Sequence, residues 1–238
     1  MEASDVASRC VSGARLALEH RHFTIDGPNG RHLCLVLPVL GPSITQLSSF
    51  LDSRMNPSFA RRAAYQAVQA PAELHAQGLC HGDMTTSNIA FSISDIDQYS
   101  EEDLVRLFGM PETTPLETES GEKPGPEAPP YIVKPLNFLA SEENIISQEI
   151  HILDFDHSFS IIWPPKEVLG TPAEWLAPEV AVGQPASPAS DVWVLGCSIY
   201  RMRSGEGPFA GIDVFSPCDV LRRIACTLGD NPASWRHV

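Results

Sequence analysis

Two short polar segments, each joined to an apolar run, constrain this chain more than any other feature. Residues 79–91 place His81, Asp83 and Asn88 between an apolar entry and a β-prone exit. Residues 150–156 form a second β-prone run that leads into Asp154. Short loops supported by strands hold functional side chains rigidly. We therefore expect the polar side chains of the two segments to form one site.

The residue types in these segments suit phosphoryl transfer to a hydroxyl group. One carboxylate receives the hydroxyl proton, while an amide oxygen and a second carboxylate hold Mg²⁺ against the phosphates. In this interpretation Asp83 is the catalytic base, and Asn88 and Asp154 are the magnesium ligands. The alternative is a polar turn in which Asp83 or Asn88 caps a backbone segment, because His-x-Asp followed by Asn occurs by chance in many chains.

Three further segments follow in order, at residues 170–179, 190–197 and 205–209. They contain Ala177-Pro178-Glu179, then Asp191-Val192-Trp193, then Gly207-Pro208-Phe209. Together with the first two segments they resemble the large lobe of eukaryotic protein kinases, across about residues 33–235. The chain is most similar to the SR-protein kinase group and its fungal relatives. That likeness comes from the hairpin at 27–30, the apolar run at 33–41 and the long spacer between Asn88 and Asp154.

This resemblance implies an α+β fold with a mainly helical large lobe and a remnant of the small-lobe sheet, truncated at both ends. Residues 1–40 would be the last small-lobe strands and the hinge, and residues 41–238 an incomplete large lobe with an insert at about 95–148. The implied activity is ATP-dependent, Mg²⁺-dependent transfer of phosphate to Ser or Thr of a protein substrate.

The resemblance also assigns roles to individual residues. Asp83 is the base, Asn88 and Asp154 bind Mg²⁺ and the nucleotide, and the hinge at Pro38, Val39 and Leu40 contacts adenine. Three structural roles and one substrate role follow in the same way: loop packing by His81, a buried ion pair by Glu179, loop anchoring by Asp191, and lining of the peptide-acceptor site by Thr171.

Several positions depart from the kinase pattern. Gly82 and Thr85 stand where Arg and Lys are usual, and Asp156 replaces the Gly of Asp-Phe-Gly. The lysines of the chain are at 123, 134 and 166, so no lysine precedes the catalytic segment, and no Gly-rich loop is present. We therefore expect this chain alone to be impaired in catalysis.

Two alternatives stay open. One is a pseudokinase or scaffold that binds partners without chemistry. The other is a small-molecule phosphotransferase of the aminoglycoside or choline kinase type, which also uses His-Gly-Asp-x-x-x-x-Asn and Asp-x-Asp. The segments at 170–179 and 191–193 favour a protein kinase, because small-molecule kinases lack the peptide-binding segment.

Composition limits the partners. The formal net charge is −14, and residues 95–149 hold thirteen acidic and three basic side chains. This balance argues against nucleic acid and anionic membranes and favours a basic partner such as an Arg/Ser-rich protein. Six cysteines form no C-x-x-C pair, which is typical of a reducing compartment, so we expect a cytoplasmic or nuclear location.

Local patterns predict the secondary elements. The turn at 26–30 should join two strands, of which the second, continuously apolar, should be buried. The interior proline at 71 should either kink the helix of residues 57–77 or leave it locally weak where it leads into the catalytic loop. In the insert, Ser100 should cap a short helix, Tyr131 to Val133 could add an edge strand, and residues 111–130 should be disordered. Further helices are expected at 44–51, 191–202 and 219–228.

Overall fold

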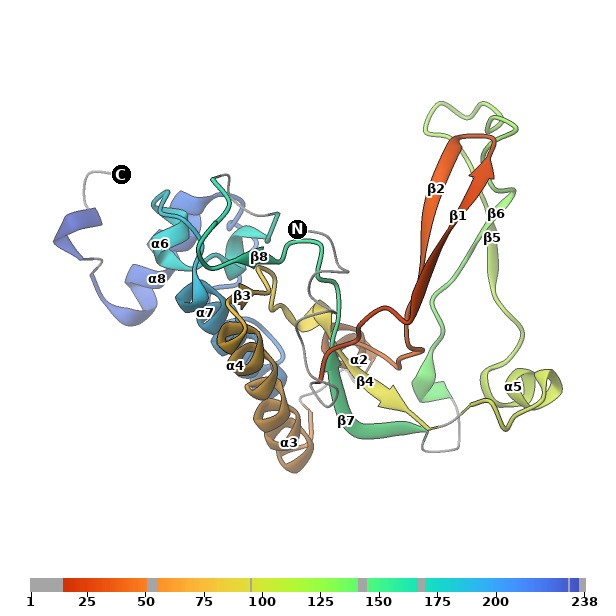
Figure 1. Ribbon diagram of the computed structural model, residues 1–238, viewed down its shortest axis with the longest axis horizontal. Helices are drawn as coiled ribbons and strands as arrows, with labels where there is room; N and C mark the ends of the chain where they lie inside the picture. The colour runs from red at the N-terminus through yellow and green to blue at the C-terminus, as the bar shows by residue number, and fades with distance from the viewer. Residues whose placement is uncertain are drawn as a thin grey trace.

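The structure is a computed structural model, described for residues 15–50, 55–94, 96–140, 145–166, 170–230 and 232–235. It is a mixed α+β fold (Figure 1). The long helices gather at one side of the view, and two β-hairpins extend from the other side. None of the described helices is both long and apolar enough to cross a bilayer.

The core is built on three helices with small residues at their contacts. These are α3 (Pro57–Ala67), α4 (Gln69–Ala76) and α7 (Pro188–Ser204). Asn56 caps α3 by accepting the Ser58 N–H at 2.9 Å. Buried alanines on α3 and α4 let the helices pack closely against the aliphatic side chains around them: Ala60, Ala63, Ala67 and Ala70.

The predicted kink before Pro71 is confirmed. The helix divides at Val68, and Pro71 is the third residue of α4. In the first turn of a helix the N–H groups have no intrahelical partner, so a proline there sacrifices no hydrogen bond. The break therefore converts a costly interior proline into a tolerated one.

A serine side chain caps the first turn of each of the two C-terminal helices. Ser187 forms a capping box with Ser190 at the start of α7, and Ser216 forms one with Asp219 at the start of α8 (Pro217–Leu228). α7 ends at Gly205, which adopts the left-handed conformation that favours glycine. The predicted helices at 191–202 and 219–228 are confirmed, as is α2 (Ile44–Phe50). The shorter helical pieces are α6 (Pro178–Ala181), η1 (Thr86–Asn88), η2 (Phe138–Ala140), η3 (Ala173–Trp175) and η4 (Ala233–Trp235).

Two small antiparallel ladders frame the predicted site. β3 (Leu79–Cys80) pairs with β8 (Phe159–Ser160), and β4 (Ile89–Ile93) pairs with β7 (Ile146–Ile152). Ile89 lies opposite Ile152, so the end of β7 meets the start of β4. The polar loop at 81–88 thus runs between two strands, beside the residues that follow β7.

The expectation of a buried strand in the N-terminal hairpin is wrong. β1 (Arg21–Gly27) and β2 (Gly30–Val36) pair through the predicted turn, but Leu33 is 65% exposed and Leu35 is 45% exposed. An apolar run predicts burial only where a second layer covers it. Among the described residues this hairpin is a two-stranded sheet that pairs with no further strand.

The insert forms local structure of its own. Ser100 and Asp103 make a capping box at the start of α5 (Glu101–Phe108), as predicted. β6 (Tyr131–Val133) is a strand, but it pairs with β5 (Thr113–Pro115) inside the insert and extends neither ladder of the core. α5 buries none of its residues, so the insert adds little to the core.

We predict that the loop at 116–130, between β5 and β6, is the first segment cut by a non-specific protease. It has no helix or strand, and nearly all of its side chains are exposed, so local opening costs little free energy. Limited proteolysis followed by mass spectrometry should release fragments ending in this loop while α7 stays intact. Equal protection of the loop and α7 would contradict the prediction.

Candidate active site

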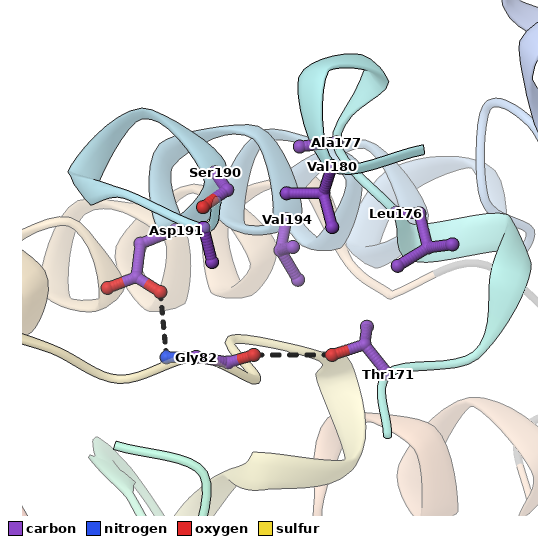
Figure 2. A pocket seen from close by; sticks show the side chains of 9 residues that line it. Gly82, Thr171, Leu176, Ala177, Val180, Ser190, Asp191 and Val194 are labelled. Carbon is purple, nitrogen blue, oxygen red and sulfur yellow. Dashed lines mark hydrogen bonds between the residues drawn. The ribbon is translucent and has the colours of Figure 1, made fainter. Parts of the chain in front are cut away.

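A single carboxylate fixes the backbone of the polar loop. Asp191, in the first turn of α7, is 2% exposed. Its Oδ1 accepts the Gly82 N–H and its Oδ2 accepts the His81 N–H, both at 2.8 Å. Figure 2 shows the Asp191 side chain directed at Gly82. Hydrogen bonds to an ionised acceptor are among the stronger ones, so the loop is held firmly against α7.

His81 packs the loop from inside. Its ring is fully buried and lies 5.0 Å from the ring of Phe155. Nδ1 accepts the Asp83 N–H at 3.2 Å, so the proton lies on Nε2, which donates to the Leu153 carbonyl at 3.1 Å. Burial lowers the pKa of His81, with the Asp191 charge opposing the shift. The side chain is thus a neutral bridge between the two polar segments.

Asp83 and Asn88 are joined directly. The Asn88 Nδ2 donates to the Asp83 carbonyl oxygen at 2.9 Å and to its Oδ2 at 2.8 Å. The other carboxylate oxygen, Oδ1, is buried without a hydrogen-bond partner. Burial raises the pKa of Asp83, the nearby Thr171 hydroxyl opposes the shift, and the Asp154 charge adds to it. Asn88 therefore occupies one oxygen of the Asp83 carboxylate, and the other is buried beside Thr171.

Asp154 lies beside this pair with an unusual backbone. Its φ is 69°, the one positive value among the described non-glycine residues. Such strain concentrates at functional sites. The Leu153 N–H donates to the Asn88 carbonyl at 3.0 Å, which joins the two segments. Burial raises the pKa of Asp154, and the neighbouring Asp156 carboxylate raises it further.

The donor atoms at this place suit a hard divalent cation. Asn88 makes both of its hydrogen bonds through Nδ2, so its Oδ1 remains the atom available to a metal. Asp154 and Asp156 add carboxylates that interact closely enough to raise the pKa of Asp154. Amide and carboxylate oxygens are the ligands that Mg²⁺ prefers. The residues present therefore fit magnesium.

Thr171 lies beside the polar loop and lines a small cavity. Its hydroxyl donates to the Gly82 carbonyl at 3.2 Å, as Figure 2 shows. The cavity beside it holds only about 20 Å³, roughly one water molecule. Apolar side chains of Leu176, Val180 and Val194 form much of its wall. In this structure Thr171 joins the polar loop to the segment before α6.

The predicted hinge residues come just before the point where the chain joins β4. Gly41, just after Leu40, donates its N–H to the Phe91 carbonyl at 2.8 Å, so the chain joins the edge of β4 there. Val39 is 67% exposed. The contacts of the described residues do not link Pro38, Val39 or Leu40 to Asp83.

Glu179 has no ion-pair partner among the described residues. Its Oε1 is buried without a hydrogen bond. Arg201 pairs with Glu174 at 3.6 Å, and its guanidinium carbon lies 5.6 Å from the centre of the Trp175 ring. The ion-pair role that the kinase resemblance assigns to Glu179 therefore stays a prediction.

Two residues outside the predicted set also position the loop. His75 Nε2 donates to Asp191 Oδ2 at 3.0 Å, and Ser198 Oγ donates to the Met84 carbonyl at 2.8 Å. Ser198 follows Asp191 by two helical turns, so the 3.6-residue period would have placed both on one face of α7. His75 gave no signal of its own in the sequence.

Comparison with known proteins gives partial matches to one family. Residues 133–226 match the model of the protein kinase domain. This match supports a protein kinase domain. The segment includes Asp154, Thr171, Glu179 and Asp191, whereas Asp83 and Asn88 precede it. The mixed helices and small sheets described above fit a kinase-like α+β fold.

Similar proteins are serine/threonine kinases. Mitogen-activated protein kinase kinase kinase 18 of Arabidopsis thaliana is 42% identical over 65 residues, which are 27% of this chain and 19% of that protein. Serine/threonine-protein kinase PknA of Mycobacterium tuberculosis is 41% identical over 83 residues, 33% of this chain and 18% of that protein. The matched segments thus cover less than a fifth of these relatives.

We predict that Glu179→Gln raises the free energy of unfolding by about 1 kcal/mol. A buried charged oxygen without a partner costs more to desolvate than a neutral amide. Glu174→Gln is the matched control, because it breaks the pair with Arg201 and should lower stability slightly. Urea denaturation of both variants measures the difference. A loss of stability in Glu179→Gln would show that this carboxylate has a favourable partner.

We further predict that stability falls as the pH drops below 6.5. Burial lowers the pKa of His81 and of His151. As the pH falls, these two imidazoles therefore bind protons in the unfolded chain before they do so in the folded chain. The stabilisation is present above pH 6.5 and lost between 6.5 and the lowered folded-state pKa. His81→Gln should remove up to about 1.4 kcal/mol per pH unit of this slope. An unchanged slope in His81→Gln would refute the assignment.

Proposed function

We propose that this chain is a serine/threonine protein-kinase-like module whose polar loop is built for phosphoryl transfer from ATP to a protein hydroxyl. One observation supports this most: Asn88 is hydrogen-bonded to Asp83, and the Asp154 charge acts on that same carboxylate. The residues proposed as base and as magnesium ligands, which come from two separate segments, are thus neighbours. Serine/threonine kinases among the similar proteins agree with this function.

Each residue has a definite task in the proposal. Asp83 would accept the proton of the substrate hydroxyl through Oδ1, the oxygen that Asn88 leaves unoccupied, once the substrate replaces the side chains that now bury it. Asn88 orients Asp83 through Nδ2 and offers Oδ1 to the metal, while Asp154 supplies the main metal carboxylate. Magnesium bound to ATP would neutralise the charge that develops on the phosphates. Pro38, Val39 and Leu40 would hold the adenine.

We also propose that this chain alone is impaired as an enzyme. Phosphoryl transfer depends on positioning and on cations around the phosphates. No lysine precedes residue 123, and Thr85, at the position where serine/threonine kinases usually have lysine, is 4% exposed. Its buried hydroxyl cannot replace a cation at the γ-phosphate. A scaffold without catalysis is the second candidate function, and the same observation favours it.

The acidic insert suggests the substrate class. Glu117, Glu119, Glu122 and Glu127 are exposed on the loop between β5 and β6, and Glu101 is exposed on α5. Surface carboxylates of one sign attract basic chains at long range, in a manner that salt weakens. An Arg/Ser-rich peptide is therefore the proposed substrate.

The test compares this chain with a chimera that carries a kinase small lobe fused upstream of residue 16. With Mg²⁺-ATP and an Arg/Ser-rich peptide, the chain alone should give no detectable transfer and the chimera should be active. Asp83→Asn in the chimera should lower kcat by about 10²–10⁴-fold, because it removes the proton acceptor. Activity should decline with added salt if the insert attracts the peptide.

The control for Asp83→Asn is Asp26→Asn, the same change at an exposed site on the β1–β2 hairpin. It should leave kcat unaltered. Asp83-dependent transfer by the unmodified chain would overturn the proposed impairment. An inactive chimera that folds and binds Mg²⁺-ATP would favour the scaffold.

A further inference from the structure

A second group of donor atoms lies behind the polar loop. His75 at the end of α4, Cys80 in β3 and Asp191 in α7 each direct one ligand atom to the same point. These three atoms lie within 4.8 Å of one another. Cys80 is fully buried, whereas the His75 side chain is 19% exposed. The group is therefore internal, with one partly exposed side chain.

From this geometry we infer a second metal site, formed by His75, Cys80 and Asp191, that takes a thiophilic divalent cation of the zinc type. Imidazole nitrogen, thiolate sulfur and carboxylate oxygen are the zinc ligands of proteins. The hard oxygen donors around Asp154 differ from them in kind. The two sites should therefore select different metals.

The separation between the His75 and Asp191 donor atoms is close to what zinc requires, and the Cys80 sulfur lies within 4.8 Å of both. Tetrahedral zinc with metal–ligand bonds of about 2.0–2.3 Å separates neighbouring donor atoms by roughly 3.3–3.5 Å. His75 Nε2 and Asp191 Oδ2 are 3.0 Å apart, so they must open by a few tenths of an ångström. The partial exposure of His75 permits that movement. Solvent can supply the fourth ligand, as in three-ligand zinc sites.

The supporting hydrogen bonds are already in place. Asp191 accepts the N–H groups of His81 and Gly82, which fixes the orientation of the carboxylate. On binding, the thiol proton of Cys80 passes to solvent. The His75 ring proton moves to Nδ1, which frees the Nε2 lone pair for the metal. The cation would then join α4, β3 and α7 by coordination where a hydrogen bond now joins α4 to α7.

Cobalt(II) and zinc are the probes that test this site, because a Co²⁺–thiolate bond gives a charge-transfer absorption. The starting protein is the full chain with Cys10, Cys34, Cys218 and Cys226 changed to Ser, treated with a chelator. We expect one equivalent of Co²⁺ to produce the band, excess Zn²⁺ to abolish it, and Zn²⁺ to raise the Tm.

Single substitutions show whether the absorption band comes from Cys80 or from another cysteine. Cys80→Ser should lose the band, and His75→Gln should weaken Zn²⁺ binding by at least about 100-fold, since even outer-shell changes cost 10–100-fold. Cys197→Ser removes a buried thiol outside the group and should keep the band. Circular dichroism establishes that each variant is folded. Absence of a band in the starting protein, or an equal band in folded Cys80→Ser, would overturn the inference.

Discussion

The Asp191 carboxylate is the interaction on which the rest of the site depends. It is nearly buried and accepts three hydrogen bonds, two from the backbone of the polar loop and one from His75. A buried carboxylate is stable only when its oxygens are satisfied in this way. Because α7 contributes several side chains to the core, the loop takes its position from the helix, and Asp83 and Asn88 take theirs from the loop.

Much of this site was predictable from spacing. The order of the polar segments and the β-prone runs beside them place Asp83, Asn88 and Asp154 together, and the structure brings these residues to one place. Helix boundaries are equally local. Ser100 starts a helix by accepting a backbone N–H three residues on, and Pro71 limits one because it has no N–H to donate. Local chemistry therefore predicts local structure well.

Tertiary context explains what the sequence did not reveal. The apolar run of β2 suggested burial, yet Leu33 is largely exposed, because coverage depends on a second layer. His75 acts only through a residue more than a hundred positions away, so no spacing in its neighbourhood indicates its role. Glu179 depends on tertiary context in the same way, because nothing in its own segment decides whether the buried carboxylate has a partner.

The exposed β1–β2 hairpin has a consequence for the colloidal behaviour of the protein. Each strand has one outer edge whose backbone groups pair with no other described strand. Phe23 and Leu33 expose large apolar surfaces on this ribbon. Such edges are templates for further strands, and charged side chains such as Arg21 and Arg31 oppose that pairing. Solubility at high concentration therefore depends on a few surface charges of the ribbon, independently of the chemistry at Asp83.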